Sequence, residues 1–127
     1  MKIYVASFFD TRARLAEPVT HLREMGHEVT SRWLQELPSA AYNTASEAYL
    51  LGCAVVDLTD IDSSDAFILD TIDETPRGGR EVEYGLALSL KLPTFVVGPY
   101  RNVFHRLATA HYASWGEALS FFAQVRR

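Results

Sequence analysis

The side chains with the greatest chemical potential are concentrated between Asp70 and Leu88, in the stretch DTIDETPRGGREVEYGLAL. A glycine pair, Gly78 and Gly79, allows a tight turn or a close approach of the backbone to a ligand. The residues that follow are typical of a helix, whose first turn offers unpaired N–H groups and a partial positive charge to an anion. The pattern is neither GxGxxG nor a Walker sequence, because Gly79 is followed by Arg80. The stretch is therefore a candidate ligand loop of another kind.

Two carboxylates, Glu81 and Glu83, fall in the first turn of this predicted helix. Acidic residues in a first turn commonly do no more than complement the helix dipole. A carboxylate at the head of an apolar stripe, in contrast, is drawn partly towards the core, where its charge needs a partner or a function. The spacing favours Glu83 for this second role. Its helix face also carries Leu86, Ala87 and Leu90, whereas the face of Glu81 carries Tyr84, Gly85 and Leu88.

A third carboxylate, Asp57, lies on an otherwise apolar stripe of a predicted helix, together with Leu50, Ala54 and Ile61. Burial there would favour its protonated form and suit it to proton donation. The alternative is an aspartate that is hydrogen-bonded to a nearby tyrosine or arginine. Glu83, at a helix N-terminus, is biased towards ionisation. Two carboxyl groups in such different environments suit glycosidic chemistry, in which one attacks the anomeric carbon and the other manages the proton of the leaving group.

A parallel sheet flanked by helices must position these residues, because short β-rich runs alternate with helix-length segments along the chain. We predict a single Rossmann/flavodoxin-like, three-layer α/β domain over residues 1–127, with a mostly parallel sheet of about five strands. The predicted strands cover 2–7, 28–33, 66–70 and 94–97, with a short edge strand ending near 112. The predicted helices cover 12–25, 44–61, 80–90 and a C-terminal segment from 114, with a loop at 37–43.

The starts of two helices and the ends of the strands carry further signals. Thr44 with Glu47, and Ser114 with Glu117, have the spacing of capping boxes. In an open α/β sheet, ligands bind beyond the carboxyl ends of the strands, here predicted at 7–10, 70–79 and 98–102. Four residues at these ends are expected to contact a substrate, namely Ser7, Phe8, Asp70 and Gly79.

The composition is that of an ordinary globular protein, with 48% hydrophobic and 22% charged residues, which argues against disorder. The formal net charge of -4 argues against a nucleic-acid groove binder but not against a mononucleotide ligand. No segment has transmembrane length or the features of a signal peptide, so we expect a cytoplasmic protein without membrane contact. Cys53 is expected to be a buried apolar residue, and the four histidines lack metal-ligand spacing with it, so neither a metal nor a redox cofactor is predicted.

Three stretches occur in an order and spacing that are found together in one enzyme family. They are residues 3–7 (IYVAS), the segment from Asp57-Leu58 through Ile61 to Ser64-Asp65, and the segment from Gly79 through Glu83-Tyr84-Gly85-Leu86-Ala87. Through them the chain resembles the nucleoside 2-deoxyribosyltransferases and their relatives, the 2'-deoxynucleoside 5'-monophosphate N-glycosidases. The resemblance implies a homodimer or higher homo-oligomer that binds a small nucleoside or nucleotide.

The resemblance also implies roles for individual residues. Glu83 would be the nucleophile that forms a covalent glycosyl intermediate, Asp57 would assist proton transfer, and Tyr4 would hydrogen-bond near the nucleophile. Asp65 would be structural, at the entrance of the third strand. Residues 98–102 fall where relatives send a residue into a neighbouring subunit's site, which makes Asn102 and His105 candidate ligand contacts, although a lone histidine is more often a packing residue.

Two features depart from the transferase pattern. Arg77 stands where the transferases have an aspartate that holds the base, and the chain ends at Arg127 without the longer tail that some transferases use in base recognition. The basic segment 75–80 points to nucleotide substrates, since Arg77 and Arg80 can bind a 5'-phosphate bidentately. The alternative is ordinary pairing of these arginines with Asp73, Glu74 or Glu81.

The hypothesis that follows is an enzyme that cleaves the N-glycosidic bond of a 2'-deoxynucleoside or its 5'-monophosphate. Water as the acceptor of the sugar would make it a hydrolase, and a second base would make it a transferase. Two alternatives stay open: a non-catalytic sensor of a nucleotide-derived ligand that uses the same pocket, and a phosphoribohydrolase-like enzyme that acts on ribonucleotides. Fold alone does not separate them.

Overall fold

The computed structural model describes residues 1–35 and 46–125 as a five-stranded sheet with helices on both faces. All strand pairs are parallel, and the strand order is β2-β1-β3-β4-β5. This is the order of flavodoxin-like doubly wound folds, and it confirms the predicted fold class. The strands are β1 (Lys2–Ala6), β2 (Glu28–Val29), β3 (Ala66–Asp70), β4 (Thr94–Val97) and β5 (Ala110–Tyr112).

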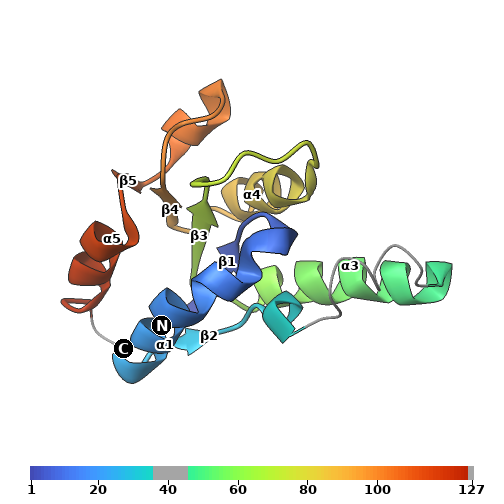
Figure 1. The fold of residues 1–127 in the computed structure, drawn as a ribbon, viewed down its shortest axis with the longest axis horizontal. Helices are drawn as coiled ribbons and strands as arrows, with labels where there is room; N and C mark the ends of the chain where they lie inside the picture. The colour runs from blue at the N-terminus through green and yellow to red at the C-terminus, as the bar shows by residue number, and fades with distance from the viewer. Residues whose placement is uncertain (36–45, 126–127) are drawn as a thin grey trace.

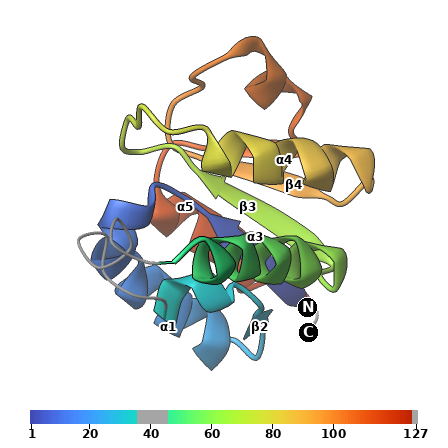
Figure 2. The ribbon, with the colours of Figure 1, turned by 90° about the vertical axis from the view of Figure 1, so that its right-hand side faces the viewer.

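Helices cover the two faces of the sheet as separate layers (Figures 1 and 2). One layer consists of α1 (Ala16–Glu24) and α5 (Trp115–Phe122), and the other of α3 (Glu47–Asp62) and α4 (Gly79–Ser89). Three short 3-10 segments complete the described chain: η1 (Phe9–Leu15), η2 (Arg32–Gln35) and η3 (Val103–Leu107). Within the described ranges, no helix has the length and apolarity needed to cross a lipid bilayer.

The core lies along the central strands, which are buried on both faces. Every residue of β3 and β4 is buried, as expected for parallel strands that are covered by helices on both sides. On the α4 face, the Tyr4 ring of β1 stacks on the Phe67 ring of β3, with ring centroids 5.6 Å apart. Phe67 in turn contacts Tyr84 of α4. Cys53 is also buried, as the sequence predicted.

The second strand is shorter than predicted, because the chain leaves the sheet after Val29 and Trp33 lies in η2. Two contacts draw this segment inward. The Trp33 indole donates to the carbonyl oxygen of Val5 at 2.7 Å, and the Arg32 guanidinium pairs with the carboxylate of Asp60 at 2.7 Å. The prediction of a strand up to residue 33 was therefore wrong, because Trp33 packs into the core from the 3-10 segment η2.

The predicted cap of α5 is confirmed, whereas the cap of α3 lies two residues after the predicted one. Ser114 caps α5, accepting from the Glu117 N–H at 3.3 Å, while the Glu117 carboxylate accepts from the Ala113 N–H. Helix α3 begins at Glu47, and its cap is Ser46, whose hydroxyl accepts from the Tyr49 N–H at 3.1 Å. Thr44, the predicted cap, lies outside the described residues, as does the predicted loop at 37–43.

Candidate active site

A pocket of about 230 Å³ opens where β1 and β3 end and α4 begins. This is the point at which the strand order reverses, with β1 followed by β2 on one side and β3 on the other. Loops diverge there, so a crevice forms at the carboxyl ends of the strands. The lining residues are Ser7, Phe8, Phe9, Trp33, Asp57, Thr75, Arg77, Gly79, Arg80 and Glu83.

Glu83 is the carboxylate of α4 that faces this pocket, and its partner is the phenol of Tyr4. Tyr4 is the fully buried middle residue of β1, and its hydroxyl donates to Oε2 of Glu83. Burial raises the pKa of Tyr4 well above its ordinary value, and the negative charges of Glu83 and Asp57 raise it further. The phenol therefore stays protonated and remains a hydrogen-bond donor to Glu83 at any pH near neutrality.

Asp57 lines the same pocket from α3, and its side chain is half-buried. Its charge raises the pKa of Tyr4, which places it within electrostatic reach of the phenol that holds Glu83. The two carboxyl groups that the sequence selected thus meet in one cavity, although they are 26 residues apart in the chain. Neighbouring Asp60 does not line the pocket, and its carboxylate accepts hydrogen bonds from the Arg32 backbone and guanidinium.

One wall of the pocket is aromatic. It consists of Phe8, Phe9 and Trp33, and the Phe9 and Trp33 rings lie with centroids 6.0 Å apart. The guanidinium of Arg12 covers the Phe9 ring at 4.6 Å from its centroid. Sequence reasoning expected only Phe8 here. Trp33 was predicted to lie in a strand, and Phe9 was not singled out within the predicted strand end at 7–10.

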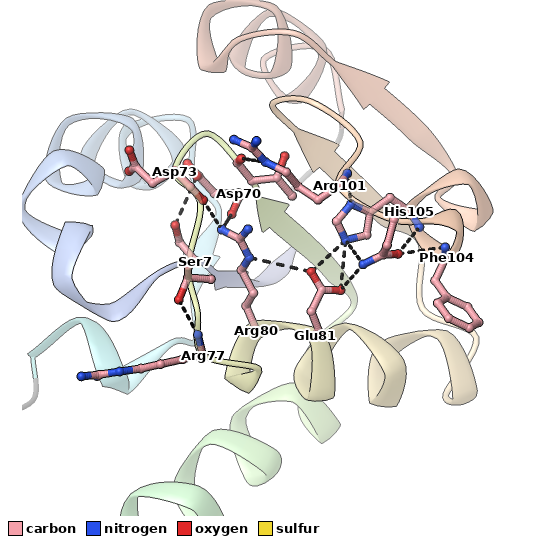
Figure 3. Close-up of polar contacts among 12 residues, drawn as sticks. Ser7, Asp70, Asp73, Arg77, Arg80, Glu81, Arg101, Phe104 and His105 are labelled. Atoms are coloured by element: carbon pink, nitrogen blue, oxygen red, sulfur yellow. Dashed lines mark hydrogen bonds and ion pairs between the residues drawn. The ribbon is translucent and has the colours of Figure 1, made fainter.

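Another part of the lining is basic and comes from the loop before α4 and from the first turn of α4. Arg80 is buried, and its NH1 group donates to the carbonyl oxygens of Asp70 at 3.2 Å and Asp73 at 2.8 Å (Figure 3). Burial lowers the pKa of Arg80, because the guanidinium loses the hydration that favours its charged form, and the negative charge of Glu81 partly offsets this effect. The exposed Arg77 has no side-chain partner within the described part of the chain, so its guanidinium is available to a ligand.

Asp70, predicted as a substrate contact, binds protein groups and does not line the pocket. Its side chain is 0% exposed at the end of β3. The carboxylate accepts hydrogen bonds from the Ser7 hydroxyl (3.2 Å), two guanidinium nitrogens of Arg14 (3.0 Å each), the Ile72 N–H (3.1 Å) and the Trp115 indole (2.6 Å). Asp70 therefore joins β1, η1, β3 and α5 beneath the pocket floor.

Asn102 and His105 both bind Glu81 of α4. Figure 3 shows His105 beside Glu81, and neither Asn102 nor His105 lines the pocket of Glu83. The His105 ring is fully buried, and its Nδ1 accepts from the Arg101 N–H at 3.0 Å. Its Nε2 must then carry the proton, which it donates to the Glu81 carboxylate at 2.9 Å. With both nitrogens engaged, His105 has no free position for acid–base chemistry in this arrangement. The predicted contact of Asn102 and His105 with a ligand stays a prediction.

Glu81 and Glu83 thus have different surroundings although they lie two residues apart. Glu81 borders an adjoining polar cleft with Glu74 and Arg101, whereas Glu83 faces the pocket that contains Asp57. The cleft and the pocket share Thr75, Arg77 and Arg80. The Arg80 guanidinium forms an ion pair with Glu81, in which Nε and Oε1 are 3.8 Å apart, too far for a hydrogen bond. Of the predicted substrate contacts, the pocket brings together Ser7, Phe8, Arg77, Gly79 and Arg80.

No protein-family model matches the chain, and no curated protein matches it by sequence. Solved structures do. A 2-deoxyribosyltransferase from Bacillus psychrosaccharolyticus superimposes with a TM-score of 0.78 at 23% identity, covering 94% of this chain and 90% of that one. A CMP N-glycosidase from Clostridium botulinum superimposes with a TM-score of 0.65 at 18% identity, covering 98% and 100%. The chain therefore has the fold of these two enzymes, and the resemblance indicated by its motifs is confirmed at the level of the fold.

Proposed function

We propose that the chain is an enzyme that cleaves the N-glycosidic bond of a 2'-deoxynucleoside or its 5'-monophosphate, with Glu83 as the nucleophile. The observation that carries this proposal is the pocket in which Glu83, held by Tyr4, faces the same cavity as Asp57. Two solved structures with the same fold are named as a 2-deoxyribosyltransferase and a CMP N-glycosidase, which supports the same class of chemistry.

In the proposed first step, a carboxylate oxygen of Glu83 attacks C1' of the sugar while the bond from C1' to the base breaks. The bonding electrons leave with the base, and Asp57 supplies the proton that neutralises it. The sugar remains as an ester of Glu83. In the second step, water or a second base attacks C1', Glu83 is released as a carboxylate, and Asp57 recovers a proton from the attacking group. The Tyr4 hydroxyl aims Glu83 throughout.

The two walls of the pocket divide the substrate between them. The aromatic wall of Phe8, Phe9 and Trp33 suits the flat face of a nucleobase, which stacks on aromatic rings. The basic wall, with the exposed guanidinium of Arg77 and the buried Arg80, suits a phosphate. Both walls line one cavity, so a nucleoside 5'-monophosphate can contact both of them, whereas a nucleoside has no phosphate for the arginines to bind.

The proposal is tested by incubating the purified chain with deoxynucleosides, ribonucleosides and their 5'-monophosphates, with and without a second free base, and following base release by chromatography. We expect release from deoxynucleoside 5'-monophosphates without an acceptor, and faster release than from the nucleosides. Exchange that requires a second base would assign a transferase, and release from ribonucleotides alone would contradict the deoxyribose assignment. Folded protein that binds these compounds but releases no base from any of them would favour the ligand sensor.

We further propose that the enzyme is a cytoplasmic homo-oligomer. Two exposed apolar surfaces support the assembly, because apolar side chains gathered in this way commonly mark a protein interface. One is a stripe on α3 and α4, formed by Leu51, Val55, Leu58 and Val82. The other is the η3 segment, which projects from the body of the molecule in Figure 1 and exposes Val103 (71%), Phe104 and Leu107.

Sedimentation equilibrium should therefore give a mass of at least two chains for the wild-type protein. A charge in the middle of the α3 stripe, Val55→Glu, should shift the mass towards one chain, because a buried carboxylate without a partner opposes association. Ser120→Glu on α5 is the matched control, since Ser120 is exposed on the opposite face of the sheet. A wild-type protein that sediments as a single chain at micromolar concentration would contradict the assembly.

A further inference from the structure

Ser7 is the residue of the pocket whose hydrogen-bonding direction is fixed by the fold. It follows β1 directly, its exposed fraction is 8%, and it lines the cavity that contains Glu83. Its hydroxyl contacts Oδ1 of Asp70 at 3.2 Å, and this is its side-chain hydrogen bond within the described part of the chain. The direction of that one bond decides what Ser7 can offer to a ligand.

The surroundings of Asp70 determine the direction. Besides Ser7, every group that contacts its carboxylate is an obligatory donor, namely the guanidinium of Arg14, the N–H of Ile72 and the indole of Trp115. Because each of these partners has a proton to donate, the Asp70 carboxylate is the acceptor in all of these contacts. The Ser7 hydroxyl must therefore donate its proton to Asp70. Its oxygen keeps its lone pairs, so towards the pocket Ser7 acts as an acceptor only.

An acceptor-only group selects its ligand atom. It binds a hydroxyl or amino group that has a proton to donate, and it does not bind a phosphate oxygen or a carbonyl oxygen. The phosphate then belongs to the basic wall and not to Ser7. The nucleophile must approach C1' closely for reaction, so the part of the substrate beside Glu83 and the β1 end is the sugar.

Resting on the proposed function, we infer that Ser7 is a specificity-determining residue that accepts a hydrogen bond from a hydroxyl group of the sugar, with Asp70 fixing its proton. For a 5'-monophosphate of 2'-deoxyribose, the free hydroxyl is the one at C3'. The enzyme therefore requires that hydroxyl, and a 3'-deoxygenated sugar leaves the Ser7 oxygen desolvated and unpaired in the complex.

The test combines a deletion on the protein with a deletion on the ligand. Wild-type and Ser7→Ala proteins are each measured with a deoxynucleoside 5'-monophosphate and with its 2',3'-dideoxy analogue. We expect the kcat/KM of the wild type to fall about tenfold when the 3'-hydroxyl is removed from the substrate. The kcat/KM of Ser7→Ala should fall less than about threefold on the same change of substrate. Ser7→Ala retains four other hydrogen bonds to the Asp70 carboxylate, so it is expected to fold. Ser63→Ala, which removes a hydroxyl that donates to the Asp60 carbonyl, is the control and should behave as wild type.

The same four combinations are measured as dissociation constants by calorimetry in a Glu83→Gln background, where no turnover consumes the ligand. Equal losses for the 3'-deoxy analogue in Ser7→Ala and wild type would overturn the assignment of Ser7, even with full enzymatic activity. Coupled losses in the dissociation constant without any turnover by the wild type would support Ser7 and contradict the proposed function alone.

Discussion

Glu83→Gln is expected to lower kcat by a factor on the order of 10⁴ or more, because the amide cannot form the glycosyl ester. The substitution keeps the size of the side chain and an oxygen that can accept from the Tyr4 hydroxyl. The fold and the binding of substrate should therefore be retained, so that the loss appears in kcat. The measurement is base release under saturating substrate, together with circular dichroism to verify the fold.

Glu81→Gln provides the matched control for this result. Glu81 lies in the same helical turn, yet its carboxylate is held by His105 and Asn102 and borders a different cleft. We expect its kcat to stay within about threefold of the wild-type value, since the glutamine oxygen can still accept from His105. Mass spectrometry of wild-type protein that is quenched during turnover should locate the added sugar on Glu83. Full activity in Glu83→Gln would contradict the nucleophile assignment.

Asp70→Ala is expected to cause the largest loss of stability, about 3 to 5 kcal/mol in the free energy of unfolding. The variant leaves the Trp115 indole and the Ile72 N–H without their acceptor in the interior, and it removes the fully buried partner of Arg14. Unfolding in urea, followed by tryptophan fluorescence, measures the loss. The reporter is suitable because Trp115 packs against the site of the change.

Asp73→Ala is the control, because it removes a more exposed aspartate that pairs with the same arginine, Arg14. Asp73 pairs with the same guanidinium at 2.9 Å, but its side chain is 39% exposed. Pairs that are open to solvent contribute little, so we expect a loss of less than about 1 kcal/mol. Equal destabilisation by the two substitutions would show that burial of Asp70 does not carry the effect.

The sheet and its helices could be predicted from the sequence because each depends on local patterns. The strands β3 and β4 are short apolar runs, and the start of α5 carries a capping box at Ser114. Both patterns can be recognised from residues that are close together in the sequence. The end of β2 could not be predicted, because it depends on a hydrogen bond from the Trp33 indole to the carbonyl oxygen of Val5 in β1, which is distant in the sequence. Similarly, the cap of α3 depends on whether Ser46 or an earlier residue reaches the first N–H groups, and the structure places Ser46 there.

The site was predictable in its carboxylates and less so in its walls. Glu83 and Asp57 stood out because acidic side chains on apolar stripes conflict with the local pattern, and they face one pocket. Asp70 was predicted to contact the substrate, and His105 with a weaker signal, but in the structure both bind other groups of the protein. What separates the two groups is which side of a strand or helix turns towards the cavity, and this depends on long-range packing that spacing does not encode.

The first turn of α4 also acts as a partition. Successive residues of an α-helix are rotated by about 100°, so Glu81 and Glu83 project about 200° apart and supply one carboxylate to each of two compartments. Inserting one residue into this turn would rotate the downstream carboxylate by about 100° and take it out of reach of Tyr4. Length changes between Gly79 and Glu83 should therefore be far less tolerated than length changes in the preceding loop, because they alter the angle at which Glu83 leaves the helix.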